Sequence, residues 1–495
     1  MGPPAERICV GSNPTLSYNK VIYVPIRFFN TMTKKEELFV PLEGRKVKMF
    51  VCGVTVYDYV HLGHARTYAF YDSLVRFLRY LGYKVTYLQN VTDVGHLLDT
   101  GEDRMIKKAK EERKHPMEIA EFYIKHWLEM MEKLKLEKPD LLPRATEHIQ
   151  EIIDQVKTLI KNGYGYESNG SVYFEVKKFK DYGKLSRKVP EELISGARVE
   201  VNPDKKDPAD FALWIKASPE HILKWESPWG LGYPGWHIED TAIAIKYFGP
   251  RYEIHGGAIE LAFPHHEAEI AQAEGTTGIK PYVKYWIHTG LLTINKEKMA
   301  KSKSNFVTIA DALIKFDPQT LRMWIASTHY RKPLDYNEND LQNAQKKVEK
   351  IRTTLTKIEE TKKIAKDKEP KLGKKLEKLK KKFLEALGDD FNSPLAISYF
   401  LEILSILNRA IDQNKITKKD LKIGEELIKE LGNIFQIVPE IKKEKIPKEV
   451  EELIEKRNQA RKMGDFKTAD ELREKIRKLG YQIEDTEKGF RVKKS

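Results

Sequence analysis

Cysteine is scarce in this sequence. The 495 residues include only Cys9 and Cys52, which excludes a disulfide scaffold and any site built from four cysteines. No uninterrupted apolar run reaches the roughly 18 residues that a membrane-spanning helix needs, so we expect no membrane span. The first 20 residues lack an apolar stretch followed by a small-residue cleavage site. We therefore expect no secretory signal and a cytoplasmic protein.

Charge is abundant and unbalanced. The chain has 87 Lys+Arg against 73 Asp+Glu, a net charge of +14, and 41% of its residues are hydrophobic. This apolar fraction is too high for a disordered chain, and the length predicts roughly two to four domains. The positive excess favours a polyanionic partner. The alternative is a Lys/Glu-rich surface of the thermophile kind, and composition does not separate the two.

A strand–helix–strand pattern occupies the first hundred residues. Residues 46–57 predict a buried strand running into a loop, 64–83 a helix, and 84–94 a second strand. Such a βαβ unit implies a parallel sheet with a right-handed crossover. The same alternation returns after residue 236, with helices expected at 238–248 and 265–275 and strands at 251–257 and 284–290.

The expected fold class is α/β, with a Rossmann-type doubly wound parallel sheet, an inserted connective domain and C-terminal α-helical domains. The insertion predicts helices over most of 102–165, a strand at 171–179 and loops thereafter. Everything beyond 317 is helical in pattern, with 343–386 interpreted as a solvated helix face, 394–411 as a bundle helix and 454–481 as a helical hairpin ending at Gly480. The expected segments are an extension (1–21), two halves of the sheet domain (22–100 and 231–316) around the insertion (101–230), a helical linker (317–385), a helical bundle (386–440) and a small C-terminal domain (441–495).

The motif His61-Leu62-Gly63-His64 stands where the first strand ends and a helix begins. A helix N-terminus offers free N–H groups and partial positive charge, so it attracts phosphate, and two imidazoles add further donors. The alternative is that His61 is a loop residue and His64 a helix cap.

A second motif, Lys298-Met299-Ala300-Lys301-Ser302, follows the last expected strand of the sheet. Two lysines on flexible stems can neutralise a departing pyrophosphate. Basic loops are common, so the motif carries weight only together with HLGH.

The two motifs together resemble the signature of class I aminoacyl-tRNA synthetases. Longer stretches are similar to the cysteinyl-tRNA synthetase family, over roughly 22–490: FVCGVTVYDYVHLGHART, SPWGLGYPGWHIED, IHGGAIELAFPHHEAEIAQAEG, ATEHI, DDFNSPLA and ADELREKIRKLGYQIEDTEKGF. This resemblance implies an ATP-dependent ligase that forms cysteinyl-adenylate and passes cysteine to the 3′ end of tRNA(Cys). His61, His64, Lys298 and Lys301 would support adenylate formation, and the partners would be L-cysteine, ATP with magnesium, and tRNA. We expect a monomer.

The resemblance also implies one zinc ion, which binds the substrate thiol. Family members hold it with two cysteines, a histidine and a glutamate, to which Cys52, Asp240, His265 and Glu269 correspond. Asp240 replaces the second cysteine, and aspartate can bind zinc through oxygen. His265 and Glu269 are four residues apart, so a helix places both on one face. Zinc prefers a soft thiolate over a hydroxyl, which would reject serine without an editing domain.

Other positions have weaker signals. Trp236 is expected to wall the amino-acid pocket or to be a core residue. Gly256 and Gly257 would let the backbone approach the nucleotide, with Glu260 as a candidate ribose contact, and a structural role is one interpretation of His266. Two other functions stay open: a ligase that gives activated cysteine to an amino sugar, and an inactive tRNA-binding relative.

Overall fold

The computed structural model describes residues 24–95, 104–188, 202–299, 306–441, 447–486 and 489–494. The chain divides into two compact units, Met1–Pro439 and Glu440–Ser495. The extension expected at 1–21 and the predicted ATP contact Lys301 lie outside the described residues, and only the backbone of Lys298 is described.

A four-stranded parallel sheet forms the centre of the first unit. Its strand order is β12-β11-β3-β5, with β3 (Lys46–Val51), β5 (Lys84–Leu88), β11 (Tyr252–Ala258) and β12 (Val283–Thr289). Helix α1 (Leu62–Tyr80) connects β3 to β5, which confirms the predicted βαβ unit. The strand order reverses between β3 and β11, so their carboxyl ends border a crevice of the kind in which α/β sheets bind ligands.

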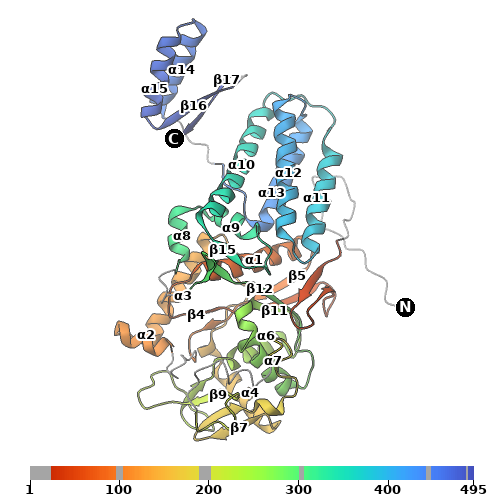
Figure 1. Ribbon diagram of the computed structural model, residues 1–495, viewed down its shortest axis with the longest axis vertical. Coiled ribbons are helices and arrows are strands. Elements are labelled where there is room, and N and C mark those ends of the chain that lie inside the picture. Colours follow the sequence, from red (N-terminus) through yellow and green to blue (C-terminus); the bar gives the residue numbers. More distant parts are fainter. Residues whose placement is uncertain are drawn as a thin grey trace, which may run out of the picture. The chain divides into compact units, whose positions relative to one another are not determined.

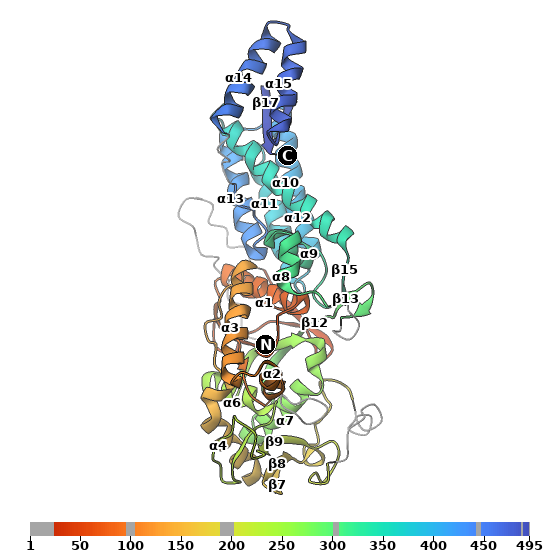
Figure 2. The same ribbon diagram turned by 90° about the vertical axis from the view of Figure 1, so that its left-hand side faces the viewer.

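Helices cover both faces of this sheet. Val47, Met49 and Val51 of β3 share an apolar cluster with α1, whereas Phe50 belongs to a second cluster with α6 (Ile238–Phe248) and α7 (His265–Thr277). Successive strand residues point to opposite faces, so β3 contributes to both cores. Figures 1 and 2 show α1 on one side of the sheet and α6 and α7 on the other. The predicted doubly wound architecture is therefore confirmed.

An antiparallel sheet is formed by three strands of the inserted segment and one strand just beyond its expected end at residue 230. Its order is β10-β9-β8-β7, with β7 (Gly165–Ser168), β8 (Ser171–Phe174), β9 (Phe211–Lys216) and β10 (Gly232–Pro234). The expectation of loops after residue 179 is wrong for β9 and β10. Leu213 and Trp214 of β9 are fully buried, but the strand is short, its flanks are rich in proline and glycine, and its partners are distant in sequence, so its local pattern is weak. The helices of the segment are α2 (Arg104–Glu112), α3 (Pro116–Lys133) and α4 (Ile149–Lys161).

Shorter strands complete the first unit. Strand β1 (Arg27–Asn30) pairs with β2 (Lys35–Leu38), and β4 (Val54–Thr55) with β6 (Val91–Thr92). Strand β13 (Leu292–Ile294) lies between β14 (Glu297–Lys298) and β15 (Leu334–Tyr336). The expectation that everything beyond 317 is helical is therefore wrong at β15.

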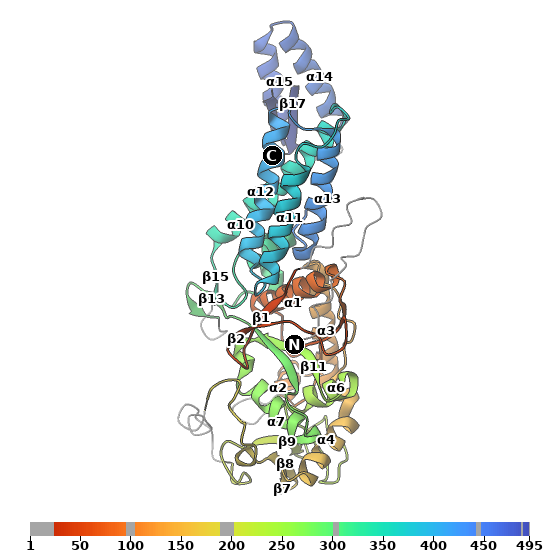
Figure 3. The same cartoon turned by 90° about the vertical axis from the view of Figure 1, so that its right-hand side faces the viewer.

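A helical bundle follows the sheet. After α8 (Ile309–Lys315) and α9 (Pro318–Ala326) come α10 (Glu338–Lys362), α11 (Gly373–Gly388), α12 (Ser393–Asp412) and α13 (Lys418–Phe435). Figure 3 shows α10 to α13 side by side. The interpretation of 343–386 as a solvated face is wrong on one side of α10, where Val348, Ile351 and Leu355 are buried in the bundle. The many lysines and glutamates around them hide an apolar stripe at helical spacing.

Among the described residues, α12 is long and apolar enough to cross a membrane by length and composition alone. Its buried residues, among them Ile397, Phe400, Leu404 and Leu407, recur at three-to-four spacing. They belong to the apolar cluster that also contains residues of α10, α11 and α13. Packing within the bundle accounts for the apolar side of this helix.

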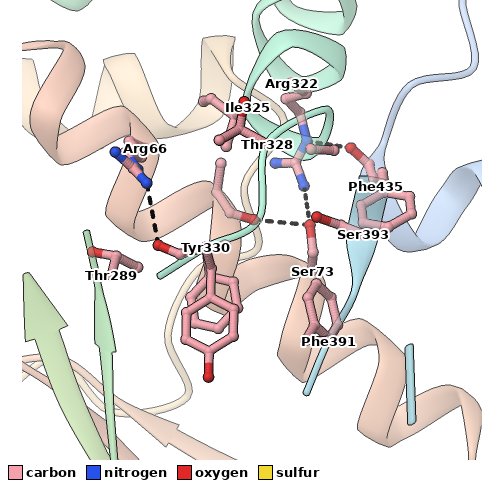
Figure 4. Close-up of a pocket in the computed structure, with 13 residues that line it drawn as sticks. Arg66, Ser73, Thr289, Arg322, Ile325, Thr328, Tyr330, Phe391, Ser393 and Phe435 are labelled. Carbon is pink, nitrogen blue, oxygen red and sulfur yellow. Dashed lines mark hydrogen bonds between the residues drawn. The ribbon is translucent and has the colours of Figure 1, made fainter. Parts of the chain in front are cut away.

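A joint connects α1 to the helical region. Arg322 of α9 is buried and forms an ion pair with Asp72 of α1, and its Nε donates to the carbonyl oxygen of Phe435 at 2.5 Å. Arg76 Nε donates to Asp72 Oδ2 at 3.0 Å. Figure 4 shows Arg322 directed toward Phe435 and Ser73, beside a cavity of about 20 Å³. That volume holds about one water molecule, so the cavity is too small for a substrate.

The second unit consists of a helical hairpin followed by a two-stranded antiparallel sheet. Helices α14 (Lys448–Lys462) and α15 (Phe466–Lys478) confirm the predicted helical hairpin, and Gly480 follows with a φ of 82°. The chain then forms an antiparallel pair, β16 (Tyr481–Thr486) and β17 (Gly489–Lys494), which the helical expectation missed. Val450, Ile454, Ile476 and Ile483 form its core.

Candidate active site

Cys52 directly follows β3, at the crevice where the strand order reverses. Its backbone N–H donates to the carbonyl oxygen of Gly256 on β11, at 3.1 Å. The ends of the two strands are thus joined, and the Cys52 side chain is buried. It faces side chains carried by α6 and α7.

The four predicted metal ligands come together in this crevice. Cys52 Sγ lies 3.8 Å from Asp240 Oδ2 and 4.0 Å from Glu269 Oε1. His265 Nε2 lies 2.6 Å from Asp240 Oδ2 and 3.2 Å from Glu269 Oε1. Asp240 stands in the first turn of α6, and His265 and Glu269 share one face of α7, as their spacing predicts. All four side chains are buried.

Two further histidines line the same cluster, and the sequence reasoning did not assign them to it. His266 Nε2 lies 3.1 Å from Cys52 Sγ, and His255 Nε2 lies 2.9 Å from Glu269 Oε2. Ligand atoms of Cys52, His265, His266 and Glu269 all lie within 4.8 Å of one another. His266 Nδ1 lies 2.8 Å from His288 Nε2, and this contact fixes the orientation of the His266 ring. The doublet His265-His266 is a signal that could have suggested His266, whereas no local signal points to His255.

Burial and neighbouring charges set the protonation of this cluster. Burial and the neighbouring Glu269 and Asp240 carboxylates raise the pKa of the Cys52 thiol well above its usual value. Burial likewise raises the pKa of Glu269 well above its ordinary range. Burial lowers the pKa of His265, but Glu269 and Asp240 outweigh it and raise that pKa overall. These directions mean that protons neutralise the Cys52 thiol and the Glu269 carboxyl group, and a metal ion that bound here would displace those protons. Sulfur, nitrogen and oxygen donors of this kind suit zinc.

His61 and His64 stand at the start of α1, which follows β3 and the Cys52 loop in the chain. His61 is the N-cap: its Nδ1 accepts from the Gly63 N–H at 3.1 Å, and His64 Nδ1 accepts from the His61 N–H at 3.2 Å. The rings stack with centroids 3.8 Å apart. Burial lowers the pKa of His61 to about 4 and that of His64 well below its usual value. Both rings are therefore neutral near pH 7 with the proton on Nε2, which is left to donate.

The segments that flank residues 300–305 contact the HLGH motif. A Cβ placed on Gly63 would lie 3.8 Å from Met299 Cε. The Phe306 ring lies edge-on to His61, with centroids 5.3 Å apart, and the Leu62 N–H donates to the Val307 carbonyl at 3.1 Å. Met299 of the second motif, together with Phe306 and Val307, therefore lies at the N-terminus of α1.

The remaining predicted positions are distributed around the crevice. Trp236 stacks on His265, with centroids 4.7 Å apart. A Cβ on Gly256 would lie 2.0 Å from both Ile287 O and Tyr71 Oη, so this glycine allows close packing within the protein. Gly257 lies beside Cys52. Glu260 raises the pKa of His61 against the larger effect of burial, which places its charge near the HLGH end.

A doubly wound parallel sheet whose first crossover helix is capped by the HLGH histidine is the arrangement expected of a class I aminoacyl-tRNA synthetase. The family model for the class I (C) tRNA synthetase catalytic domain matches residues 38–346. A DALR domain matches 382–438, and a cysteinyl-tRNA ligase anticodon-binding domain matches 443–492. The chain belongs to the cysteine–tRNA ligase family, which confirms the resemblance drawn from its sequence.

Relatives match over almost the whole chain. A cysteine–tRNA ligase of Thermococcus gammatolerans is 44% identical over 475 residues, covering 94% of this chain and 98% of the relative. One from Coxiella burnetii is 43% identical over 474 residues with the same coverage. Among solved structures, a Mycobacterium tuberculosis methionyl-tRNA synthetase in complex with methionyl-adenylate has a TM-score of 0.57 at 13% identity, covering 80% of this chain and 92% of that chain. A LeuRS of Agrobacterium radiobacter K84, in a ternary complex with tRNA and LeuAMS, has a TM-score of 0.57 at 10% identity, covering 79% and 84%. These structures support the fold.

Proposed function

We propose that this chain activates L-cysteine with ATP and transfers it to the 3′ end of tRNA(Cys). In the first step a carboxylate oxygen of cysteine attacks the α-phosphate of ATP, and pyrophosphate leaves. In the second, a hydroxyl of the terminal adenosine attacks the carbonyl carbon, and AMP leaves. The observation that carries this proposal is the link between the histidine-capped helix and the buried cluster: Tyr68 of α1 stacks on His64, with centroids 6.1 Å apart, and its Oη donates to the Cys52 carbonyl oxygen at 3.3 Å.

The N-terminus of α1 would bind the phosphates of ATP, which enters with magnesium. His61 and His64 donate from Nε2, because each Nδ1 already accepts a backbone N–H. Lys298 and Lys301 would neutralise the departing pyrophosphate, where charge builds up in the transition state. Positioning and charge stabilisation carry this chemistry. Contact of Gly256 and Gly257 with the nucleotide remains a prediction.

The buried cluster would hold one zinc ion through Cys52, Asp240, His265 and Glu269. Such an ion supplies a soft Lewis acid that prefers a substrate thiolate over the hydroxyl of serine. Trp236, stacked on His265, would border the bound amino acid. His266 is the alternative ligand to Asp240, because its Nε2 is as near to Cys52 as any other donor in the cluster.

The second unit would bind the anticodon end of the tRNA. The match over 443–492 to an anticodon-binding domain favours tRNA over an amino sugar as the acceptor. Its lysines and arginines would contact phosphates, so tRNA affinity should fall as salt rises. We expect a cytoplasmic monomer that needs no membrane.

The test compares cysteine-dependent pyrophosphate exchange with tRNA charging in the full chain and in a deletion of 440–495. The deletion begins at residue 440 because a cut before α11 would also remove α11 to α13, which pack in the core of the first unit. We expect exchange to persist and charging to fall sharply. Full charging by the truncated protein would refute the tRNA role of the second unit, and the absence of cysteine-dependent exchange in the full chain would refute the activity.

A further inference from the structure

Asn90 connects two parts of the cluster that are far apart in sequence. It lies between β5 and β6 and is only 1% exposed. Its Nδ2 donates to Asp240 Oδ1, and its Oδ1 accepts from the Gly53 N–H at 2.8 Å. Gly53 directly follows Cys52, so one amide group contacts both the Cys52 loop and the residue that replaces the family's second cysteine.

The approach of Asn90 to this loop is tight. A Cβ on Gly53 would lie 1.7 Å from the Asn90 carbonyl oxygen, so only glycine allows the contact. A weaker contact at 3.3 Å joins Asn90 Nδ2 to Thr92 Oγ1. Asn90 is therefore held on more than one side and has little freedom to follow Asp240 if that carboxylate rotates.

The hydrogen bond from Asn90 gives the two carboxylate oxygens of Asp240 different surroundings. Oδ1 is engaged by Asn90, whereas Oδ2 faces Cys52 Sγ at 3.8 Å and His265 Nε2 at 2.6 Å. A cysteine offers one donor atom at one place, but an aspartate has two oxygens and a rotatable carboxylate. Hydrogen bonds from outside the ligand set orient ligands and set metal affinity.

We propose that Asn90 is a positioning residue that makes Asp240 a one-oxygen metal ligand, and so lets an aspartate take the place of the missing thiolate. This inference rests on the proposed metal site. The chain would need Asn90 for metal binding only while residue 240 is an aspartate, since a thiolate cannot accept through a second oxygen.

The test is a double-mutant cycle on metal affinity. Zinc affinity is measured by competition with a chromophoric chelator for the wild type, Asn90→Ala, Asp240→Cys and the double variant. Loss of an outer hydrogen-bond partner commonly costs about 10–100-fold in metal affinity. We expect that loss for Asn90→Ala in the wild-type background and a change of less than about threefold in the Asp240→Cys background.

A matched control and a spectroscopic readout separate positioning from structure. Thr67→Val removes a buried hydroxyl of the same unit, which lies 3.0 Å from Thr289 Oγ1 and bonds neither Asn90 nor a residue of the cluster, and should leave metal affinity unchanged. With Co²⁺ in place of zinc, the wild type should show the intense d–d bands of a four-coordinate site, and Asn90→Ala should weaken them. The cobalt spectrum of the wild type alone is also a test, which does not depend on whether a variant folds. Weak bands of a five- or six-coordinate site would overturn the inference.

The remaining outcomes are distinct. Equal losses of affinity in both backgrounds would show that Asn90 is only structural and would overturn the proposal. A wild type that binds neither zinc nor cobalt would instead overturn the metal site of the proposed function. Asn90→Ser serves where Asn90→Ala does not fold, because its shorter hydroxyl cannot reach Asp240.

Discussion

The α1–α9 joint and the cluster at Cys52 both bury acidic side chains in the first unit, but the groups that face these acids differ. In the joint, Asp72 faces the guanidinium groups of Arg322 and Arg76. In the cluster, Asp240 and Glu269 face a thiol and histidine rings, with no lysine or arginine among the ion pairs that the described residues form there. The joint is balanced by the protein itself. In the cluster, protons on Cys52 and Glu269 limit the negative charge, and the proposed metal ion would take their place.

Removing the cation of the joint should have the largest effect on stability. Arg322→Met leaves Asp72 buried with an ion pair to Arg76 and a hydrogen bond from the Glu137 N–H, and breaking a buried ion pair costs about 3–5 kcal/mol. Urea unfolding at pH 7 measures the loss. Zinc content of the folded protein should be unchanged, because Arg322 touches no residue of the cluster. An equal loss of zinc would show that the two regions are coupled and would break the comparison.

Removing the sulfur ligand of the cluster should cost metal affinity instead. If four ligands share the roughly 10–16 kcal/mol with which zinc binds structural sites, each accounts for about 2.5–4 kcal/mol. Cys52→Ser should lose that much, and Asp240→Asn and His266→Asn should lose less because the thiolate remains. Zinc stoichiometry and cysteine versus serine activation rates provide the measurement. Chelation should abolish cysteine activation without unfolding the sheet, and a zinc-free wild type that still prefers cysteine would refute the role of the metal.

The phosphate end of the crevice should be separable from both regions. Lys301→Ala should slow cysteine-dependent pyrophosphate exchange on the order of 100-fold, because one preorganised contact to developing charge is lost. Zinc content and stability should stay as in the wild type. Lys296→Ala, at an exposed lysine of the preceding turn, is the matched control. A Lys301 variant with a normal exchange rate and only a raised cysteine requirement would contradict the assignment.

The smallest expected effect is the pH dependence contributed by His61. Its pKa is lowered from 6.5 to about 4, so between these values the unfolded chain binds a proton that the folded protein does not. Stability should therefore fall as pH decreases through this range, by at most about 1.4 kcal/mol per pH unit and less for a partly exposed ring. His61→Asn keeps a helix-capping residue without the titration. Unfolding at pH 7, 6 and 5 should show the wild type losing stability relative to this variant, and parallel curves would contradict the lowered pKa.

The sequence alone determined the elements whose signals are local. Hydrophobic periodicity located α1, α6 and α7, β3 and β11, and the four-residue spacing of His265 and Glu269 placed them on one helix face. The position of HLGH at the strand-to-helix junction predicted its place at the start of α1. Where charged residues hid an apolar stripe, as in α10, or where proline-rich flanks surrounded a short strand, as in β9, the same periodicity was too weak.

Only the tertiary structure decided which distant side chains meet. His255, on a strand, and His266, beside a predicted ligand, join Cys52 because the strand order reverses between β3 and β11, and sequence spacing does not reveal strand order. Asn90 reaches Asp240 across 150 positions of the chain, and Arg322 reaches Asp72 across 250. Burial then determined their chemistry, because a carboxyl group that is ionised at a surface in water has a raised pKa beside a thiol in a closed site, as Glu269 has.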